Sequence, residues 1–315
     1  MKKIKALLLT EGMHGMISQV EGMAKALEAE YSHKTVRLSF PWILIPPKIT
    51  PVLEIVLKDK IYLKKDESID MIISCGRKSV IPSILLKKKY PNLFTIHIQD
   101  PKVSFKNFDL IVAPEHDNLV GSNVFNSKGA IHYITESEIN NAKAYLKKNI
   151  NSEKVVSLVL GGPNKYYNFD TYQIVNIFNQ IKSSFISKGY KVIVIPSMRT
   201  PKSIIELSIK EMGPFGHVVN RVDKQAYLSA YALADYVVVT CDSTSMISEA
   251  ATSGKPIYVA HMKAKKNDYR FKRFFKLFRD MGITRSLGEE VESWTYNKHN
   301  EAIRIAAMIK QKIRN

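Results

Sequence analysis

The chain has 315 residues, of which 45% are hydrophobic and 10% are aromatic. A chain of this length is long enough for two ordinary domains, and its composition is that of a globular protein rather than a disordered one. The two cysteines, Cys75 and Cys241, lie far apart and have no Cys/His cluster near them. This excludes a disulfide scaffold and a structural zinc site, and we expect no bound metal.

Charge is strongly unbalanced, because 47 Lys and Arg residues against 29 Asp and Glu give a formal net charge of +18. A solvated surface is one explanation, and attraction to a phosphate-bearing ligand or an anionic membrane face is the sharper one. Between His261 and Arg285, nine Lys and Arg residues are interleaved with aromatic side chains. The aromatic spacing in Phe271–Phe278 is helical, so we expect these rings to cover a core while the charges face water. We expect no nucleic-acid partner.

Neither a membrane span nor a signal peptide is expected. No segment has the roughly 20 uninterrupted apolar residues that a spanning helix needs. The apolar run Leu7–Leu9 ends at Thr10, so it has the length of a strand rather than of a signal peptide. We therefore expect a cytoplasmic protein, with any contact to the inner membrane being peripheral.

Apolar, β-rich runs alternate with segments of helical period along the first part of the chain. Continuous apolar strands separated by helices are typical of a parallel sheet covered on both faces. The expected strands are Lys5–Thr10, Lys34–Phe40, Asp70–Ser74, Leu93–Ile98 and Asp109–Ala113, and the expected helices are Met16–Glu30, Pro51–Leu63 and Ser79–Tyr90.

A polar helical segment, Thr135–Lys154, marks the join between two domains, and the α/β alternation then restarts. The expected strands are Val155–Leu160, Lys191–Pro196, His217–Val222, Asp235–Thr240 and Pro256–Ala260, and the expected helices are Tyr172–Lys188, Lys202–Met212, Lys224–Ala232 and Thr244–Ser253. The sequence thus predicts an α/β protein of two doubly wound, Rossmann-like domains that face a cleft lined by the carboxyl ends of both sheets. We place the domains at 1–140 and 141–296, with a last helix in 297–315 that crosses back to the first.

A glycine-containing turn follows the first strand of each domain. The first turn contains Gly12, His14 and Gly15, and the second contains Gly161 and Gly162. Glycine lets the backbone come close to a ligand, and the N-terminus of a following helix presents free N–H groups to anions. Neither turn has the GxGxxG or P-loop pattern, so each is also explained as a tight connection.

Two further turns of the second domain carry side chains suited to phosphate oxygens. Ser197–Thr200 follows one strand, and Cys241–Glu249 follows another, where Asp242 or Ser243 is also explained as a helix cap. Three such turns at strand ends indicate a nucleoside diphosphate bound without a Walker motif, with Glu249 reaching a ribose or sugar hydroxyl. The predicted nucleotide-sugar site consists of Gly161, Gly162, Asn164, Ser197, Arg199, Thr200, Asp242, Ser243, Thr244 and Glu249.

Polar residues at the predicted strand ends of the first domain form the candidate acceptor side. Carboxylates and imidazoles placed there can act as a general base. Asp100 is the first choice for this catalytic role, followed by His116 and Asp117, whereas His97 lies inside an apolar strand and is expected to be a core histidine. The other residues expected on the acceptor side are Gly12, His14, Gly15, Gln19, Gly76, Arg77 and Gln99.

Short motifs at the predicted strand ends recur along nearly the whole chain. They include Cys75-Gly76-Arg77-Lys78, Thr95–Pro101, Gly161-Gly162, Arg199-Thr200-Pro201 and Asp242-Ser243 with Glu249-Ala250. In these motifs the chain resembles the family of the plant elongated-mitochondria fission factor, whose bacterial members are described as glycosyltransferases of the GT-B fold. The resemblance implies a GT-B-like fold with the nucleotide sugar on the second domain. It also links bacterial members to lipopolysaccharide core assembly, and the plant member to recruitment of fission machinery.

Together, the residues and the resemblance predict a glycosyltransferase that moves a sugar from a nucleoside-diphosphate sugar to a cell-envelope acceptor, lipid-linked or saccharide, similar to the lipopolysaccharide core. Helix N-termini and Arg can stabilise the leaving diphosphate, so we expect a metal-independent reaction with no cofactor besides the donor substrate. Two alternatives stay open: a nucleotide-sugar 2-epimerase, and a non-catalytic, membrane-associated adaptor of the fission-factor type. The joint presence of Arg199, Asp242 and Glu249 argues against the adaptor.

One apolar segment, Trp42–Pro47, falls where a loop or strand end is expected, and it precedes the basic stretch Lys58–Lys65. A lipid-linked acceptor would require the first domain to lie against the inner leaflet, where each Lys or Arg contributes about 1 kcal/mol. The segment therefore either contacts the membrane surface or caps the core of the first domain.

Overall fold

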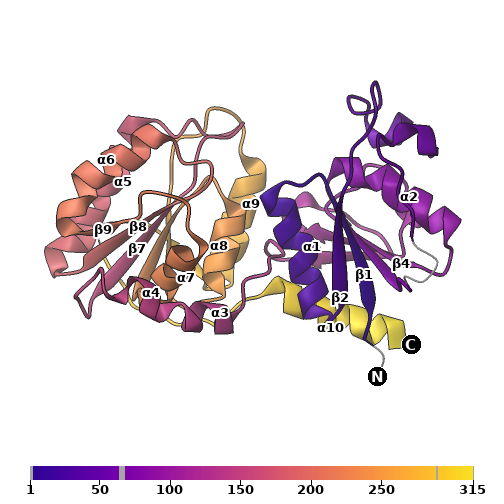
Figure 1. The fold of residues 1–315 in the computed structure, drawn as a ribbon. Coiled ribbons are helices and arrows are strands. Elements are labelled where there is room, and N and C mark those ends of the chain that lie inside the picture. The colour runs from indigo at the N-terminus through magenta and orange to yellow at the C-terminus, as the bar shows by residue number, and fades with distance from the viewer. Residues whose placement is uncertain (1–2, 64–67, 289, 315) are drawn as a thin grey trace. The chain divides into compact units, whose positions relative to one another are not determined.

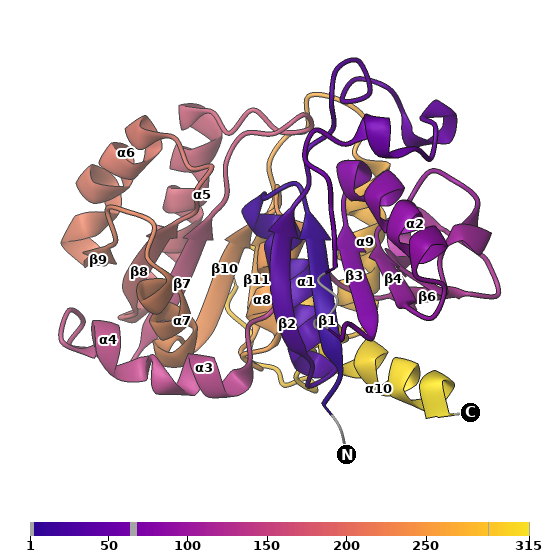
Figure 2. The same ribbon diagram turned by 45° about the vertical axis from the view of Figure 1, so that its right-hand side comes forward.

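The computed structural model describes residues 3–63, 68–288 and 290–314. The chain divides into two compact units, the first made of residues up to Tyr133 together with the segment from Asn300 onward, and the second of Ile134–His299. Each unit is built on one six-stranded sheet with helices on both of its faces (Figure 1, Figure 2). The predicted fold class, an α/β protein of two doubly wound, Rossmann-like domains, is confirmed.

The sheet of the first unit is parallel and has the strand order β2-β1-β3-β4-β5-β6. The chain winds outward in opposite directions from β1 and β3, so the topological switch point lies between these two strands. The strands are β1 (Lys5–Thr10), β2 (Glu30–Thr35), β3 (Met71–Cys75), β4 (Phe94–Ile98), β5 (Leu110–Pro114) and β6 (Val124–Ser127), and the helices are α1 (His14–Ala26), α2 (Val80–Lys89) and α10 (Glu301–Arg314).

Alternate side chains of β1 enter two separate cores, because successive residues of a strand point to opposite faces. Leu8 packs with Met23 of α1 and Ile305 of α10 on one face of the sheet. Leu7 packs on the other face with Leu86 of α2. The final helix of the chain is therefore part of the first unit's core.

The sheet of the second unit is also parallel and has the order β12-β11-β10-β7-β8-β9. Its switch point lies between β7 and β10. The strands are β7 (Val155–Leu160), β8 (Lys191–Pro196), β9 (Gly216–Val218), β10 (Tyr236–Thr240), β11 (Ile257–Ala260) and β12 (Thr284–Ser286), and the helices are α3 (Glu136–Asn141), α4 (Lys143–Lys147), α5 (Thr171–Ser184), α6 (Lys202–Met212), α7 (Lys224–Leu233), α8 (Thr244–Ala251) and α9 (Tyr269–Asp280).

Helices cover both faces of this second sheet. Leu158 of β7 packs with Phe178 of α5 and Met212 of α6 on one face. Ile193 of β8 packs with Ala230 of α7 on the other. A polar side chain caps the start of some of these helices. Before α7, for example, the side chain of Asp223 accepts a hydrogen bond from the N–H of Ala226, which fixes where the helix begins.

Two predicted elements of the first unit are wrong. The expected helix Pro51–Leu63 contains a single 3₁₀ turn, Glu54–Val56, and the expected strand Lys34–Phe40 is replaced by β2, which ends at Thr35. The reason is main-chain pairing between the two segments, in which the N–H of Lys58 donates to the carbonyl of Arg37 at 3.0 Å. This pairing stabilises an extended chain in a segment whose apolar spacing alone resembles a helix. Strands β6 (four residues) and β12 (three residues), the edge strands beside β5 and β11, were not predicted.

Part of the segment Trp42–Pro47 caps the core of the first unit, and part of it is exposed. Trp42 and Ile43 pack against the buried Leu38 and Val56, as expected if the segment caps this core. Leu44, in contrast, is 73% exposed, and further large apolar side chains in the same loop are exposed as well, namely Phe40, Ile49, Leu53 and Ile55. We call residues 40–55 the apolar loop. Of the basic stretch Lys58–Lys65, the last two residues lie outside the described part of the chain.

Within the described ranges, no helix combines the length and the apolar character that crossing a membrane requires.

Candidate functional site

Three polar turns meet at the carboxyl edge of the second sheet, beside its switch point. Strand β7 lies between β8 and β10, so the turns that follow these strands are neighbours. Gly161 and Gly162 follow β7, Ser197–Thr200 follows β8, and Asp242 follows β10. The structure thus brings together residues that are more than 80 positions apart along the chain, from Gly161 to Asp242.

Asp242 is the centre of this arrangement. Its buried carboxylate accepts hydrogen bonds from the N–H of Gly162 at 2.9 Å, from the hydroxyl of Thr240 at 2.7 Å and from the guanidinium of Arg199 at 2.8 Å. Burial raises the pKa of Asp242, and these three donors act in the opposite direction. The carboxylate therefore ties together all three turns, a role larger than the helix cap considered from the sequence, which belongs to Ser243.

The two glycines of the β7 turn are required by close packing against the other turns. A Cβ at Gly161 would lie 2.1 Å from Oδ2 of Asp242, and one at Gly162 would lie 2.1 Å from the carbonyl oxygen of Arg199. Both distances are far below a normal contact, so a larger residue would separate the turns. These glycines thus have a structural reason to be glycine even without a ligand.

Arg199 joins the turns after β7 and β8. Its Nη1 donates to the carbonyl of Gly162 at 2.9 Å while its Nη2 binds Asp242, and 41% of its side chain stays exposed. Ser197 donates to the carbonyl of Gly161 at 3.0 Å and Thr200 to that of Leu160 at 3.0 Å. The two hydroxyls hold the turn in place, whereas the guanidinium still presents a surface to solvent.

Helix α8 begins beside Asp242, and Ser243 is its N-cap, accepting from the N–H of Met246 at 3.3 Å. The N–H groups of Thr244 and Ser245 have no acceptor among the residues that the structure describes. Asn164, in the segment that follows β7, donates to the carbonyl of Asp242 at 3.0 Å. This edge therefore presents free N–H groups, hydroxyls and a guanidinium, which suits an anionic ligand.

Glu249 lies in the last turn of α8 rather than at its start. Its Oε2 accepts a hydrogen bond of 2.5 Å from the hydroxyl of Tyr227 in α7, and burial raises the pKa of Glu249 to about 7. Tyr227 was missed as a site residue in the sequence. The available signal was its spacing from Tyr231, since the two rings meet edge-on along one side of the helix, with centroids 4.8 Å apart.

Glycines also bracket the switch point of the first unit. Gly12 and Gly76 have φ of +87° and +90°, a region that favours glycine. Between them, the carboxylate of Glu11 pairs with Lys78 at 2.8 Å. Of the other predicted acceptor-side residues, Gln19 donates to the carbonyl of Gly15 at 3.0 Å, His14 lies edge-on to Tyr133 with ring centroids 6.2 Å apart, and Gln99 donates to Gln19 at 3.4 Å.

The guanidinium of Arg77 is hydrogen-bonded to main-chain carbonyls of the apolar loop. It donates to the carbonyls of Ile43 at 2.5 Å and Ile45 at 2.9 Å, so it holds the base of the apolar loop. The sequence placed Arg77 on the acceptor side, and the structure gives it this structural role as well.

The candidate bases of the first unit differ in their surroundings. Asp100 follows β4 and accepts from the N–H of Lys102 at 2.9 Å, with the Lys102 ammonium 2.5 Å away. His116 is buried, and its Nε2 lies 3.9 Å from the Asp117 carboxylate. His97 is the expected core histidine: it is buried, its Nδ1 is 2.9 Å from the hydroxyl of Ser74, and burial lowers its pKa to about 3.

The described residues contain no group of three or more His, Cys, Asp or Glu side chains arranged to hold a metal ion. Both thiols are buried, and burial raises the pKa of Cys241 to about 12, which makes it a poor nucleophile.

Comparison with solved structures shows a shared fold. The chain superposes on the UDP-GlcNAc 2-epimerase of Methanocaldococcus jannaschii, solved with UDP-GlcNAc and UDP, with a TM-score of 0.51, 12% identity and full coverage of both chains. The enzyme of Neisseria meningitidis bound to UDP-GlcNAc also gives a TM-score of 0.51, at 10% identity with full coverage of both chains. At such low identity these matches establish the fold alone.

Two relatives are closer in sequence. Uncharacterized protein RP120 of Rickettsia prowazekii is 28% identical, over 76% of this chain and 79% of that protein. Mitochondrial fission protein ELM1 of Arabidopsis thaliana is 26% identical, over 77% of this chain and 64% of that protein. The family profile described as Mitochondrial fission ELM1 matches residues 14–313, in agreement with the resemblance seen in the motifs, and the chain belongs to this family.

Proposed function

We propose that the second unit binds the nucleoside diphosphate of a nucleotide sugar, and that the chain transfers the sugar to a cell-envelope acceptor similar to the lipopolysaccharide core. The observation that carries the proposal is the meeting of three polar turns around Asp242 at the β7/β10 switch point. Open α/β sheets bind their ligands outside the carboxyl ends of the strands at such a point.

The diphosphate has three kinds of donor available at this edge. The first N–H groups of α8 and the hydroxyl of Thr244 would hold one phosphate, and the exposed edge of Arg199 the other. Because Asp242 fixes the guanidinium, its orientation is set before the ligand arrives. Donors that are already in place can stabilise the charge that develops on a leaving diphosphate without a metal ion.

The partly buried pair of Glu249 and Tyr227 gives the site an acceptor for hydroxyl groups. Glu249 Oε2 is occupied by the hydroxyl of Tyr227 at 2.5 Å, which leaves the second carboxylate oxygen for a ribose or sugar hydroxyl. A carboxyl with a pKa of about 7 is partly neutral at physiological pH. Donor binding should therefore depend on pH in this range.

We assign activation of the acceptor to the first unit, with Asp100 as the general base. Its carboxylate follows β4 and is fixed by the N–H of Lys102. His116 and Asp117, after β5, are the next candidates for this role.

Solved proteins of the same fold support a nucleotide sugar as the ligand, since two UDP-GlcNAc 2-epimerases of this fold were solved with UDP-GlcNAc bound.

The deciding experiment incubates the full chain with a panel of nucleotide sugars, with and without a cell-envelope extract as acceptor. Release of nucleoside diphosphate only when the acceptor is present supports the transferase. Conversion of the sugar without an acceptor identifies an epimerase instead. The absence of any turnover, together with binding to fission-type partner proteins, contradicts an enzyme and supports the adaptor.

We also propose that the first unit lies on an anionic membrane surface through its apolar loop. Phe40 and Leu44 expose 79% and 73% of their surface, and Lys48 and Lys58 lie nearby in the sequence. Exposed apolar side chains next to basic ones are typical of interfacial contact. A lipid-linked acceptor would then be presented at this surface.

A further inference from the structure

A basic pocket of about 330 Å³ lies in the second unit, between helix α9 and strands β11 and β12. None of the residues around Asp242 lines it. Polar walls come from α9, from His261 at the end of β11 and from β12, while Val259, Met262 and Phe275 supply apolar surface. Its basic side chains are Lys272, Lys276, Arg279 and Arg285.

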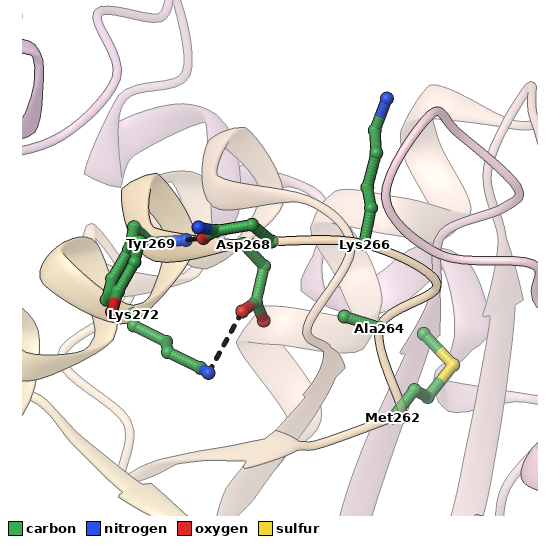
Figure 3. Close-up of a pocket in the computed structure, with 7 residues that line it drawn as sticks. Met262, Ala264, Lys266, Asp268, Tyr269 and Lys272 are labelled. Atoms are coloured by element: carbon green, nitrogen blue, oxygen red, sulfur yellow. Dashed lines mark hydrogen bonds and ion pairs between the residues drawn. The ribbon is translucent and has the colours of Figure 1, made fainter.

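A second hollow, of about 440 Å³, adjoins this pocket and shares Met262, Asp268 and Lys272 with it (Figure 3). In Figure 3 the ammonium of Lys272 points toward the carboxylate of Asp268, and the two groups are 3.2 Å apart. Asp268 also accepts from the hydroxyl of Tyr167 at 2.9 Å. Asp268 thus forms the boundary between the two hollows and is held from both sides.

The helix fixes where the positive charges lie. Lys272, Lys276 and Arg279 are spaced by four and three residues, so they lie along one side of α9. The opposite side carries Phe274 and Phe278, which are fully buried. The basic side of α9 is therefore anchored over the pocket by the core beneath it.

Charges in the pocket are poorly balanced. Four cationic side chains line it against one carboxylate, Asp268. Lys276 pairs at 2.5 Å with Asp280, which lies on the exposed end of the helix and outside the pocket. For Arg279, the described part of the chain offers no paired carboxylate. Lys272 and Arg285 also have carboxylate partners, Asp268 and Glu292, so the guanidinium of Arg279 is the charge that most favours an anion in the pocket.

Arg285 is held in place from the opposite wall. Its guanidinium lies over the ring of Trp294, 4.4 Å from the centroid, and pairs with Glu292. His261 completes the wall, with its ring edge-on to Phe275 at 5.0 Å. Burial and the neighbouring Arg279 lower the pKa of His261, so it is a neutral hydrogen-bonding group near pH 7.

We propose that this pocket is a second ligand site, which binds a phosphate group through Lys276, Arg279 and Arg285. Guanidinium and ammonium groups arranged around a polar pocket match the several oxygens and the double charge of a phosphate monoester. The apolar wall leaves room for an organic part next to that phosphate. The site is independent of the proposed function, because it shares no residue with the diphosphate site at Asp242.

The test uses inorganic phosphate as the probe and Trp294 as the reporter. The chain has two tryptophans, so Trp42→Phe leaves Trp294 as the only one. Phosphate that binds Arg285 should change Trp294 fluorescence, because the guanidinium lies on that ring. In this background, Lys276→Gln and Arg279→Gln should each weaken phosphate about tenfold or more, since each removes a charge-assisted hydrogen bond. Both side chains point into solvent-accessible space, so the fold should be retained.

Matched controls are Arg270→Gln and Arg273→Gln, which remove the same charge from the same helix outside the pocket. They should leave phosphate affinity unchanged. The titration is repeated with UDP in excess, and binding that persists supports a second site. Equal affinity in the pocket and control variants, or complete competition by UDP, overturns the proposal.

A parallel arm uses phosphatidylcholine vesicles with and without phosphatidic acid. Flotation that requires phosphatidic acid and is lost in Arg279→Gln identifies a lipid headgroup as the source of the phosphate. Binding of soluble phosphate without flotation identifies a free metabolite, and both results support the pocket. Flotation that is unaffected by Arg279→Gln, combined with no binding of soluble phosphate, contradicts it.

Discussion

The guanidinium of Arg199 lies 2.8 Å from the buried carboxylate of Asp242, and that carboxylate also accepts the N–H of Gly162. Three turns from strands β7, β8 and β10 are therefore connected through one side chain. This relationship changes what Arg199 is expected to do. Its place after a strand predicts a contact with a ligand, and the structure makes it part of the local packing too.

Substitution of Arg199 should thus affect both stability and binding. In Arg199→Ala, Asp242 loses one of its donors while it stays buried, which should lower the free energy of unfolding by about 1–3 kcal/mol. Affinity for the nucleoside diphosphate should fall about tenfold or more for the same reason. Denaturant unfolding and calorimetry measure the two effects. Arg221→Ala, an exposed arginine in the same unit, is the control and should change neither; unaltered binding in Arg199→Ala would rule out the diphosphate site.

The pKa of Glu249 predicts a specific pH dependence of stability. Burial raises this pKa from its ordinary value of 4.5 to about 7, so the folded state holds a proton that the unfolded state releases. Its contribution to stability is complete below pH 4.5 and is lost as pH rises to about 7. Burial lowers the pKa of His97 to about 3, so the unfolded state takes up a proton that the folded state does not. His97 therefore lowers the free energy of unfolding as pH falls below 6.5.

Glu249→Gln isolates the first effect, because it keeps the shape of the side chain and removes the titration. The difference in unfolding free energy between wild type and variant should change between pH 4.5 and about 7 and be flat above. Urea unfolding at a series of pH values measures it. A difference that does not depend on pH would mean that Glu249 titrates normally.

Asp100 should be needed for turnover and not for donor binding. Positioned general bases contribute roughly 10²–10⁴-fold to rate, so Asp100→Asn should lose activity in that range with unchanged affinity for the nucleotide sugar. Lys102→Met is a useful companion, since it removes the ammonium 2.5 Å from the carboxylate and keeps the carboxylate itself. Near-normal turnover in Asp100→Asn would transfer the role to His116 or Asp117.

Membrane association should depend on the exposed members of the apolar loop. Wild type should sediment with anionic liposomes at low salt and less at about 0.5 M salt, where charge attraction is screened. Leu44→Asp should abolish sedimentation without unfolding the first unit, because Leu44 is 73% exposed. Val120→Asp, at an exposed position outside this loop, should have no effect. If wild type fails to sediment at low salt, the acceptor is soluble and the membrane proposal is wrong.

Much of the fold followed from the sequence, because buried parallel strands are long apolar runs. Strands β1, β7 and β8 begin and end at the predicted residues. The failures share a cause, since they depend on contacts between distant segments. The pairing of Arg37 with Lys58 replaced a predicted helix, and no local pattern encodes it.

The candidate site shows the same limit. Turn composition pointed to Gly161, Arg199 and Asp242, and parallel topology is what brings them together. Composition did not indicate that the arginine and the carboxylate bind each other, nor that Tyr227 closes over Glu249. Such pairings are set by packing between elements that are distant in the sequence, so no local pattern encodes them.

A thermal-shift titration against the common nucleoside diphosphates tests whether the second unit binds a nucleoside diphosphate. At about 100 times its dissociation constant a ligand that binds only the folded state adds roughly 2.7 kcal/mol of stability. At least one nucleoside diphosphate should raise the melting temperature of wild type and have a much smaller effect on Arg199→Ala. If no nucleoside diphosphate or nucleotide sugar shifts the wild-type melting temperature, the turns around Asp242 are purely structural and the proposed donor site is wrong.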